Sequence, residues 1–217
     1  MSELWALPVI ENALLVLVEY PEPEGIVGPV AEAVGGEAAA RLKRLMAEDL
    51  LRAAMQLDGC TTYVFFDPAE REDDVLDWLD PLGGGLVMAA QMPGGTGARM
   101  HAAFRRIFAR NATGRAVLVM AGHPAMDARF LRGALDSLDA ADVVAASSSS
   151  GGVCLLGMSR MHDALLTDVD WDARGAVDAA VGRCGAMGLR VARLPEQRGA
   201  ATPDDLDALM PGWRSRV

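Results

Sequence analysis

The chain has 217 residues, of which 51% are hydrophobic and 23% charged, as expected for a single globular domain over residues 1–217. The formal net charge is −10 and the basic residues form no cluster, which argues against nucleic acid or an anionic membrane surface as a partner. The three cysteines lie far apart, a pattern that indicates neither a disulfide scaffold nor a zinc site and favours a reducing, cytoplasmic location.

The predicted elements begin with an apolar run at residues 13–18, which is too short to span a membrane and lacks the basic flank of a signal peptide. This run and the later ones are continuous rather than alternating, as in strands buried on both faces of a sheet. We expect strands at residues 13–18, 61–66, 86–90, 116–121, 142–146 and 153–157.

The segments between these strands show the spacing of amphipathic helices. In residues 37–57, apolar side chains recur at three- and four-residue intervals, while Arg41, Lys43 and Arg44 fall largely elsewhere on the helical wheel. Further helices are expected at residues 71–79, 97–110, 127–138, 174–188 and after Thr202, which is placed to act as an N-cap. The alternation of strand and helix predicts an α/β fold, a three-layer α/β/α sandwich with a mostly parallel sheet.

Ligands of open α/β sheets bind beyond the carboxyl ends of the strands, so the loops that follow the strands are the candidate sites. The loop after the first strand, at residues 19–30, contains Tyr20 and Pro21 and carries acids and prolines but no base. Because prolines remove amide donors, a stiff surface turn is favoured there over a phosphate site.

The loop after the third strand is the best candidate for an anion site. Gly94, Gly95 and Gly97 lead into a helix whose first turn carries Arg99. Glycines allow a ligand to approach the backbone, and amides at a helix start favour an anion. A plain glycine turn and helix cap is the alternative.

The loops after the fourth and fifth strands carry His123 and a run of four serines. His123 or Asp127 could act as a base, although a histidine without a partner at suitable spacing is more typical of a loop. The serines end at Ser150 and precede Gly151 and Gly152. Their hydroxyls and amides could hydrogen-bond a ligand, but they offer no carboxylate for a divalent cation, and a mobile loop is the alternative.

The order of these segments resembles the DUF2064 family of small bacterial glycosyltransferase-like proteins, from about Ala13 to Met210. The resemblance implies the nucleotide-diphospho-sugar transferase (GT-A) fold, with Mg or Mn and a nucleotide-sugar as the expected ligands. A more distant similarity links the chain to nucleotidylyltransferases such as phospholactate guanylyltransferase.

The match to the family's motifs is selective. Most matching residues are glycines, prolines and apolar residues that set the backbone path and packing, and the matches are Pro21, Pro23, Gln91, Gly97, Arg99, Met100, Pro124, Gly151, Gly152, Leu155 and Gly157. Positions where the family has bases or acids carry other residues, and they are Glu19, Val27, Pro29, Gly95, Gly122, Ser150, Gly199 and Ala201. We therefore predict a degenerate member with no metal site, no cofactor and no catalytic residue.

Such a member would bind a protein partner or a small molecule in the old cleft. The residues expected to contact the ligand are Tyr20, Pro21, Gly94, Gly95, Gly97, Arg99, His123, Ser150, Gly151 and Gly152. The alternative is an active, metal-independent nucleotide-sugar or nucleotidyl transferase that holds phosphates at residues 94–99 and uses His123 or Asp127 as base. A structural subunit beside an active homologue, or a homodimer, is also compatible with the sequence.

An interaction protein would present an exposed apolar patch. Trp5 and the C-terminal segment at residues 209–217 are the candidates for such a patch, and packed termini are the alternative.

Overall fold

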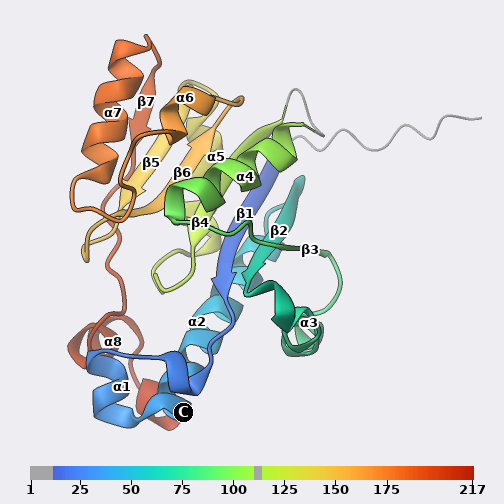
Figure 1. Ribbon diagram of the computed structural model, residues 1–217, viewed down its shortest axis with the longest axis vertical. Helices are drawn as coiled ribbons and strands as arrows, with labels where there is room; N and C mark the ends of the chain where they lie inside the picture. The colour runs from blue at the N-terminus through green and yellow to red at the C-terminus, as the bar shows by residue number, and fades with distance from the viewer. Residues whose placement is uncertain (1–11, 110–113) are drawn as a thin grey trace, which may run out of the picture.

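Seven strands form one sheet in the order β3-β2-β1-β4-β6-β5-β7 (Figure 1). The computed structural model describes residues 12–109 and 114–217. The strands are β1 (Asn12–Glu19), β2 (Cys60–Asp67), β3 (Leu86–Ala90), β4 (Arg115–Met120), β5 (Val143–Ser147), β6 (Val153–Met158) and β7 (Val191–Arg193). All neighbouring pairs are parallel except those of β6, which runs antiparallel to β4 and β5. The predicted mostly parallel sheet is confirmed.

Helices cover both faces of this sheet and make the three predicted layers. The helices on the two faces are α2 (Gly36–Met55), α3 (Glu72–Leu79), α4 (Thr96–Phe108), α5 (Ala128–Ser137), α6 (Asp163–Leu166) and α7 (Ala176–Ala186), while α1 (Pro29–Val34) and α8 (Pro203–Leu209) lie below the sheet. On β1, Leu15 and Leu17 pack into the cluster beneath α4, α6 and α7, whereas Leu14 and Val16 pack beneath α2, α3 and α5. Burial on both faces is why the apolar runs are continuous.

A third, smaller cluster lies below the sheet, where α1, α8 and the C-terminus surround the first half of α2 (Figure 1). We call this part the lower lobe. Its core consists of Leu42, Met46, Leu206, Met210 and Trp213. The predicted cap of α8 is confirmed, because Thr202 Oγ1 accepts a hydrogen bond from the backbone N–H of Asp205, and the Asp205 carboxylate accepts one from the backbone N–H of Thr202.

The candidate apolar surface at residues 209–217 is wrong. Trp213 is 1% exposed and Met210 is 7% exposed, because both fill the core of the lower lobe. Trp5, the other candidate, lies outside the described residues. Among the residues that the structure does describe, no helix combines the length and apolar character that a membrane crossing requires.

The sheet closes tightly around Gly157, which lies opposite Val117 on β4 and Val144 on β5. A β carbon at Gly157 would approach within 2.6 Å of Val144 Cγ1 and 2.8 Å of Val117 Cγ2. Both valines are buried and their branched side chains turn with difficulty. This position therefore requires glycine for close packing.

We expect Gly157→Ala to lower the free energy of unfolding by about 1–3 kcal/mol, the usual cost of overpacking a core. Urea unfolding followed by circular dichroism measures the change. Gly133→Ala in the exposed part of α5 is the matched control, since nothing lies within 4 Å of its new β carbon. The control should gain roughly 0.5–1 kcal/mol from helix propensity. Equal stabilities of Gly157→Ala and the unaltered protein would contradict the packing argument.

Candidate functional site

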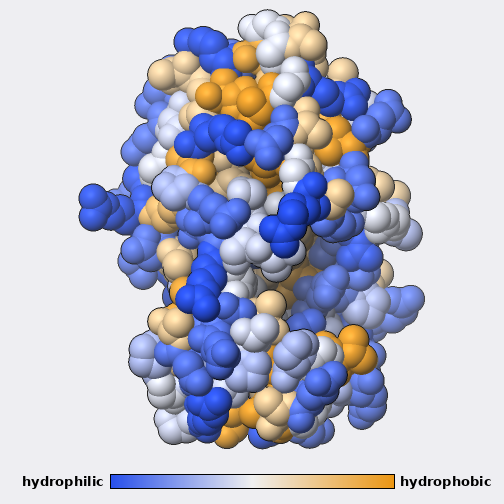
Figure 2. Space-filling view, turned by 90° about the vertical axis from the view of Figure 1, so that its left-hand side faces the viewer, coloured by the Kyte–Doolittle hydropathy of each residue, from blue (hydrophilic) through white to orange (hydrophobic). Residues whose placement is uncertain are grey.

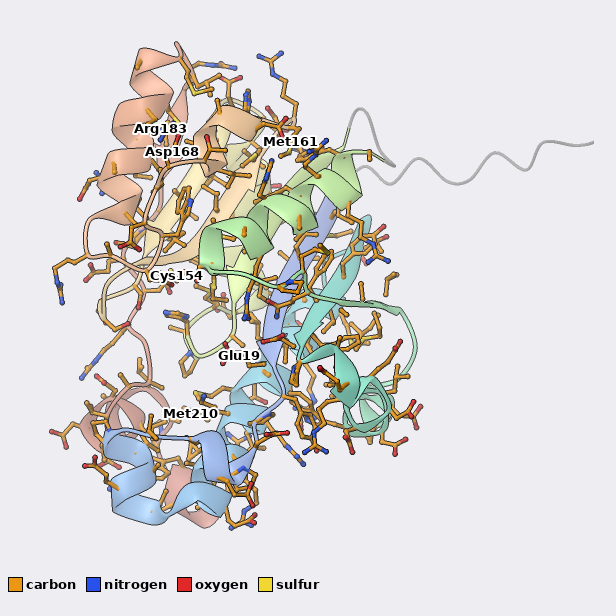
Figure 3. The ribbon with its side chains drawn as sticks, viewed as in Figure 1. Glu19, Cys154, Met161, Asp168, Arg183 and Met210 are labelled. Carbon is orange, nitrogen blue, oxygen red and sulfur yellow. The ribbon has the colours of Figure 1, made fainter. Side chains whose placement is uncertain are left out.

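A cleft of about 290 Å³ lies where the carboxyl ends of β1 and β4 meet α2 and α4. Figure 2 shows the surface hollowed between the sheet and the lower lobe. Most of the lining is apolar and comes from Leu17, Val18, Met46, Ala47, Met120 and Ala121. Three charged side chains border it, namely Glu19, Lys43 and Arg99. In Figure 3, Glu19 lies at the lower end of β1, above the lower lobe that contains Met210.

Gln91 organises the cleft where β1 and β2 end. Its side chain is buried, and Nε2 donates hydrogen bonds to the carbonyl oxygens of Val18 at 3.0 Å and Phe65 at 2.9 Å. The remaining oxygen, Oε1, accepts from Arg99 Nη1 at 3.3 Å. One amide therefore joins two strand ends to the first turn of α4.

Arg99 is held in place by several groups of the protein itself. Its Nη1 lies 3.0 Å from Asp67 Oδ2 and 3.9 Å from Glu19 Oε1, and its Nε donates to the carbonyl oxygen of Gly94 at 2.8 Å. Two carboxylates thus offset the charge of this guanidinium. The predicted role of Arg99 in anion binding remains a prediction, and the geometry shows a structural role as well.

Lys43 is the cation that sequence reasoning missed. It is the only lysine of the chain, and we expected it away from the apolar stripe of its helix. The structure places it on the wall of the cleft beside Met46 and Ala47. The signal was present in the spacing, because residues at i, i+3 and i+4 share one side of a helix.

The glycines predicted to contact a ligand have different structural roles. A β carbon at Gly97 would lie 2.8 Å from Trp171 Cδ1, and one at Gly152 would lie 2.9 Å from the Trp171 carbonyl oxygen. The absence of a side chain at both glycines therefore leaves space for the fully buried Trp171 between α4 and the serine loop. Gly151 has a positive φ of 105° and Gly94 one of 131°, conformations that favour glycine. Gly95 precedes α4 and supplies no side-chain cap.

Tyr20 and Pro21 line an adjoining pocket of about 210 Å³ that shares Glu19 and Lys43 with the cleft. The Tyr20 hydroxyl accepts a hydrogen bond from Arg44 Nη2 at 2.8 Å. The guanidinium carbons of Arg44 and Arg71 lie 4.9 Å and 5.4 Å from the centre of its ring. Cations are thus present near the first loop, but they stack on Tyr20 within the protein.

His123 and the serine run meet at the carboxyl ends of β4 and β5. His123 has a partner, because Nε2 lies 3.0 Å from Ser148 Oγ, and Ser148 Oγ lies 2.7 Å from Ser150 Oγ. Hydrogen bonds connect Ser148 and Ser150 within the serine loop, and Ser148 is buried. The contact between His123 and Ser148 could not be read from spacing, since the two residues are 25 positions apart.

The hydrogen bonds of His123 define which ring nitrogen carries the proton. Nδ1 lies 3.3 Å from the Met120 carbonyl oxygen, which can only accept, so Nδ1 donates. Nε2 then accepts from Ser148 Oγ, and Ser148 Oγ accepts from the Ser150 hydroxyl. Burial lowers the pKa of His123 below its ordinary value, so the ring is neutral near pH 7.

Three positions where the family resemblance places acids converge on this hydrogen-bonded cluster. A β carbon at Gly199 would lie 3.5 Å from Ser148 Oγ and 3.6 Å from both His123 Nε2 and Ser150 Oγ. Gly122 precedes His123, and its carbonyl oxygen accepts from the backbone N–H of Ala200 at 3.1 Å. The positions have come together, but their acidic side chains are absent.

The donors at this point do not fit the Mg or Mn ion that the family resemblance implies. They are one imidazole and two hydroxyls, whereas these hard cations take carboxylate oxygens. Throughout residues 12–109 and 114–217, no three side chains of His, Cys, Asp or Glu form a group that could hold a metal. We therefore derive no chemistry through a metal ion.

The fold and the cleft define the class as an α/β protein of the nucleotide-diphospho-sugar transferase type. A crystal structure of a "putative nucleotide-diphospho-sugar transferase" from Desulfovibrio desulfuricans G20 has 25% sequence identity and a TM-score of 0.84, over 93% of this chain and 87% of that chain. The 4-diphosphocytidyl-2C-methyl-D-erythritol synthase of Anaerococcus prevotii DSM 20548 shares the fold, with 10% identity and a TM-score of 0.60, over 93% and 96% of the two chains.

The particular family is DUF2064, described as an uncharacterized protein conserved in bacteria, whose model matches residues 50–173. The chain belongs to this family. A comparison with curated proteins finds no match.

The neutral state of His123 gives a pH-dependent stability with a definite sign. The unfolded histidine takes up a proton near its ordinary pKa of 6.5, whereas the folded one resists protonation, so stability falls as the pH drops below that value. We expect His123→Gln to remove part of this decline. Urea unfolding at about pH 7.5 and about pH 5.5, on either side of the ordinary histidine pKa, measures this decline in stability.

His101→Gln is the control, because His101 lies on α4 and pairs with Asp163 at 2.6 Å, far in sequence from the serine cluster. This control should retain the decline between the two pH values. His162 has a pKa lowered by burial too, so some decline should persist without His123. The same decline in His123→Gln as in the unaltered protein would refute the assignment.

Proposed function

We propose that this chain is a ligand-binding member of the DUF2064 family that holds a small molecule in its cleft and has lost metal-dependent nucleotidyl or glycosyl transfer. The observation that carries the proposal is the neutral cluster of His123, Ser148 and Ser150, where Gly122, Gly199 and Ser150 replace the expected acids. The side chains of this cluster hydrogen-bond to one another. This supports a site that is stable without the acids and without a metal ion.

The chemistry of transfer explains why these losses weigh against catalysis. A diphosphate leaving group accumulates negative charge as it departs. Transferases neutralise this charge with a metal ion or with hydrogen-bond donors that are already in position. Hydroxyls and a neutral imidazole provide none of the carboxylate oxygens by which Mg²⁺ or Mn²⁺ is usually held. The residues present therefore support binding more than transfer.

A metal-independent transferase receives less support, because its three proposed residues have other partners. Arg99 contacts Asp67 and Gly94, and His123 accepts from Ser148. Asp127 caps α5 by accepting from the backbone N–H of Phe130 at 2.8 Å. All three residues stabilise the fold around the cleft.

A small molecule is favoured over a protein partner because the candidate C-terminal surface is packed inside the lower lobe. All three cysteines are free, and Cys154 and Cys184 are buried. Free thiols fit the cytoplasm, where we place the protein.

The proposal predicts that Mn²⁺ does not change how the protein responds to nucleotide-sugars. We expect the same thermal midpoint for the unaltered protein with UDP-glucose in the presence and absence of Mn²⁺. The matched variant is Ser150→Asp with Gly199→Asp, which returns two carboxylates to neighbouring positions. The β carbon at residue 199 makes only ordinary contacts there.

The double variant should bind Mn²⁺, measured as loss of the free-ion paramagnetic resonance signal. At a ligand concentration about a hundred times the Kd, binding would add roughly 2.7 kcal/mol and shift the midpoint by several degrees. A shift of the unaltered protein that needs both Mn²⁺ and UDP-glucose would overturn the proposed function.

A further inference from the structure

Lys43 differs from the other cations that lie in or near the cleft and its adjoining pocket. Arg99, Arg44 and Arg71 each contact a carboxylate or an aromatic ring of the protein. Lys43 forms no ion pair or hydrogen bond within the part of the chain that the structure describes, although it is exposed on the cleft wall. An exposed ammonium group without a partner is available to a ligand.

One positive charge at the cleft has no ion-pair partner among the described residues. Arg99 lies between Asp67 at 3.0 Å and Glu19 at 3.9 Å, so this arginine already faces two negative charges. Lys43 shares the cleft with Glu19, but no oxygen of Glu19 approaches it within ion-pair distance among the described residues. A ligand with a single negative charge matches this arrangement.

The usual place for a second negative charge is already filled. Thr96, the first residue of α4, donates from Oγ1 to Asp172 Oδ1 at 2.7 Å. A carboxylate therefore lies at the helix start, where a phosphate would otherwise gain from the helix dipole. A diphosphate would meet Asp172 at this point and Glu19, which lies 3.9 Å from Arg99, in the cleft lining.

The rest of the cleft is suited to an apolar group. Leu17, Val18, Met46, Ala47, Met120 and Ala121 surround it, and its polar side chains Gln91 and Thr96 already form hydrogen bonds. The flexible thioethers of Met46 and Met120 can adapt to the shape of a bound chain or ring. Burial of apolar surface would supply affinity, while the ammonium group would orient the ligand.

We propose that the cleft binds a small carboxylate with an apolar body, and that Lys43 contacts the carboxylate group. This inference rests on the proposed function, because it names the ligand class of the same metal-free cleft. It differs from the chemistry that the family resemblance implies, which is a nucleotide-sugar with a metal ion. Lys43 comes from α2, whereas the family's basic positions lie on the loop after β1.

The chain provides its own reporter for this contact, because Lys43 and the terminal α-amine are its only aliphatic amines. We would acetylate the full chain with acetic anhydride, with and without octanoate, and measure labelling by peptide mass spectrometry. Octanoate should slow labelling of Lys43 severalfold and leave the α-amine unchanged. Octanamide, which has the same apolar body without the charge, should protect less.

Calorimetric titration of variants then tests the role of the charge. Lys43→Gln should weaken octanoate binding about tenfold, as expected for a charge-assisted contact, and Lys43→Arg should restore most of it. Arg41→Gln is the matched control, because Arg41 is an exposed cation on the same helix, two residues away and outside the cleft lining. This control should leave the affinity unchanged.

The outcomes separate this inference from the proposed function. No binding of octanoate by the unaltered protein up to roughly 10 mM, or equal affinity for Lys43→Gln, overturns the carboxylate site. Metal-free binding of UDP-glucose in the same titrations would then leave the proposed function intact. Binding of UDP-glucose that requires Mn²⁺ overturns the proposed function, whatever octanoate does.

Discussion

The arrangement of the cleft depends on how the backbone carbonyls at the ends of β1 and β2 are satisfied. Buried carbonyls without donors are costly, and neither Val18 nor Phe65 can rely on water at this depth. The Gln91 amide supplies both donors and presents its oxygen to Arg99. The strand ends and the first turn of α4 are therefore coupled, and an open sheet acquires a cleft of defined shape.

The same coupling gives the arginines near the cleft a role in the fold. Arg99 joins Gln91, Asp67 and the loop carbonyl of Gly94, so its removal would release three parts of the structure. Arg44 and Arg71 stack on Tyr20 and keep the first loop against α2 and α3. These three arginines serve the fold, whereas Lys43 on the cleft wall forms no ion pair or hydrogen bond among the described residues.

Much of the fold could be predicted from local patterns. The six expected strands and the main helices are all present. They could be predicted because burial on one or both faces sets the spacing of apolar residues along the sequence. The antiparallel direction of β6 could also have been predicted. The linker between β5 and β6 is too short for the crossover helix that a parallel pair would need. β7 was missed because Val191–Arg193 is short and only partly buried, so it shows no apolar run.

The sequence by itself determined the layer architecture and showed which acidic and basic residues of the family's motifs are replaced in this chain. Only the tertiary structure decided what those changes produce. Gly122, Ser150 and Gly199 meet because they follow separate strands or loops that end at one edge of the sheet. Whether a charged group is satisfied, as Arg99 is, or available, as Lys43 is, depends on side chains that arrive from distant segments, and local periodicity carries no information about them.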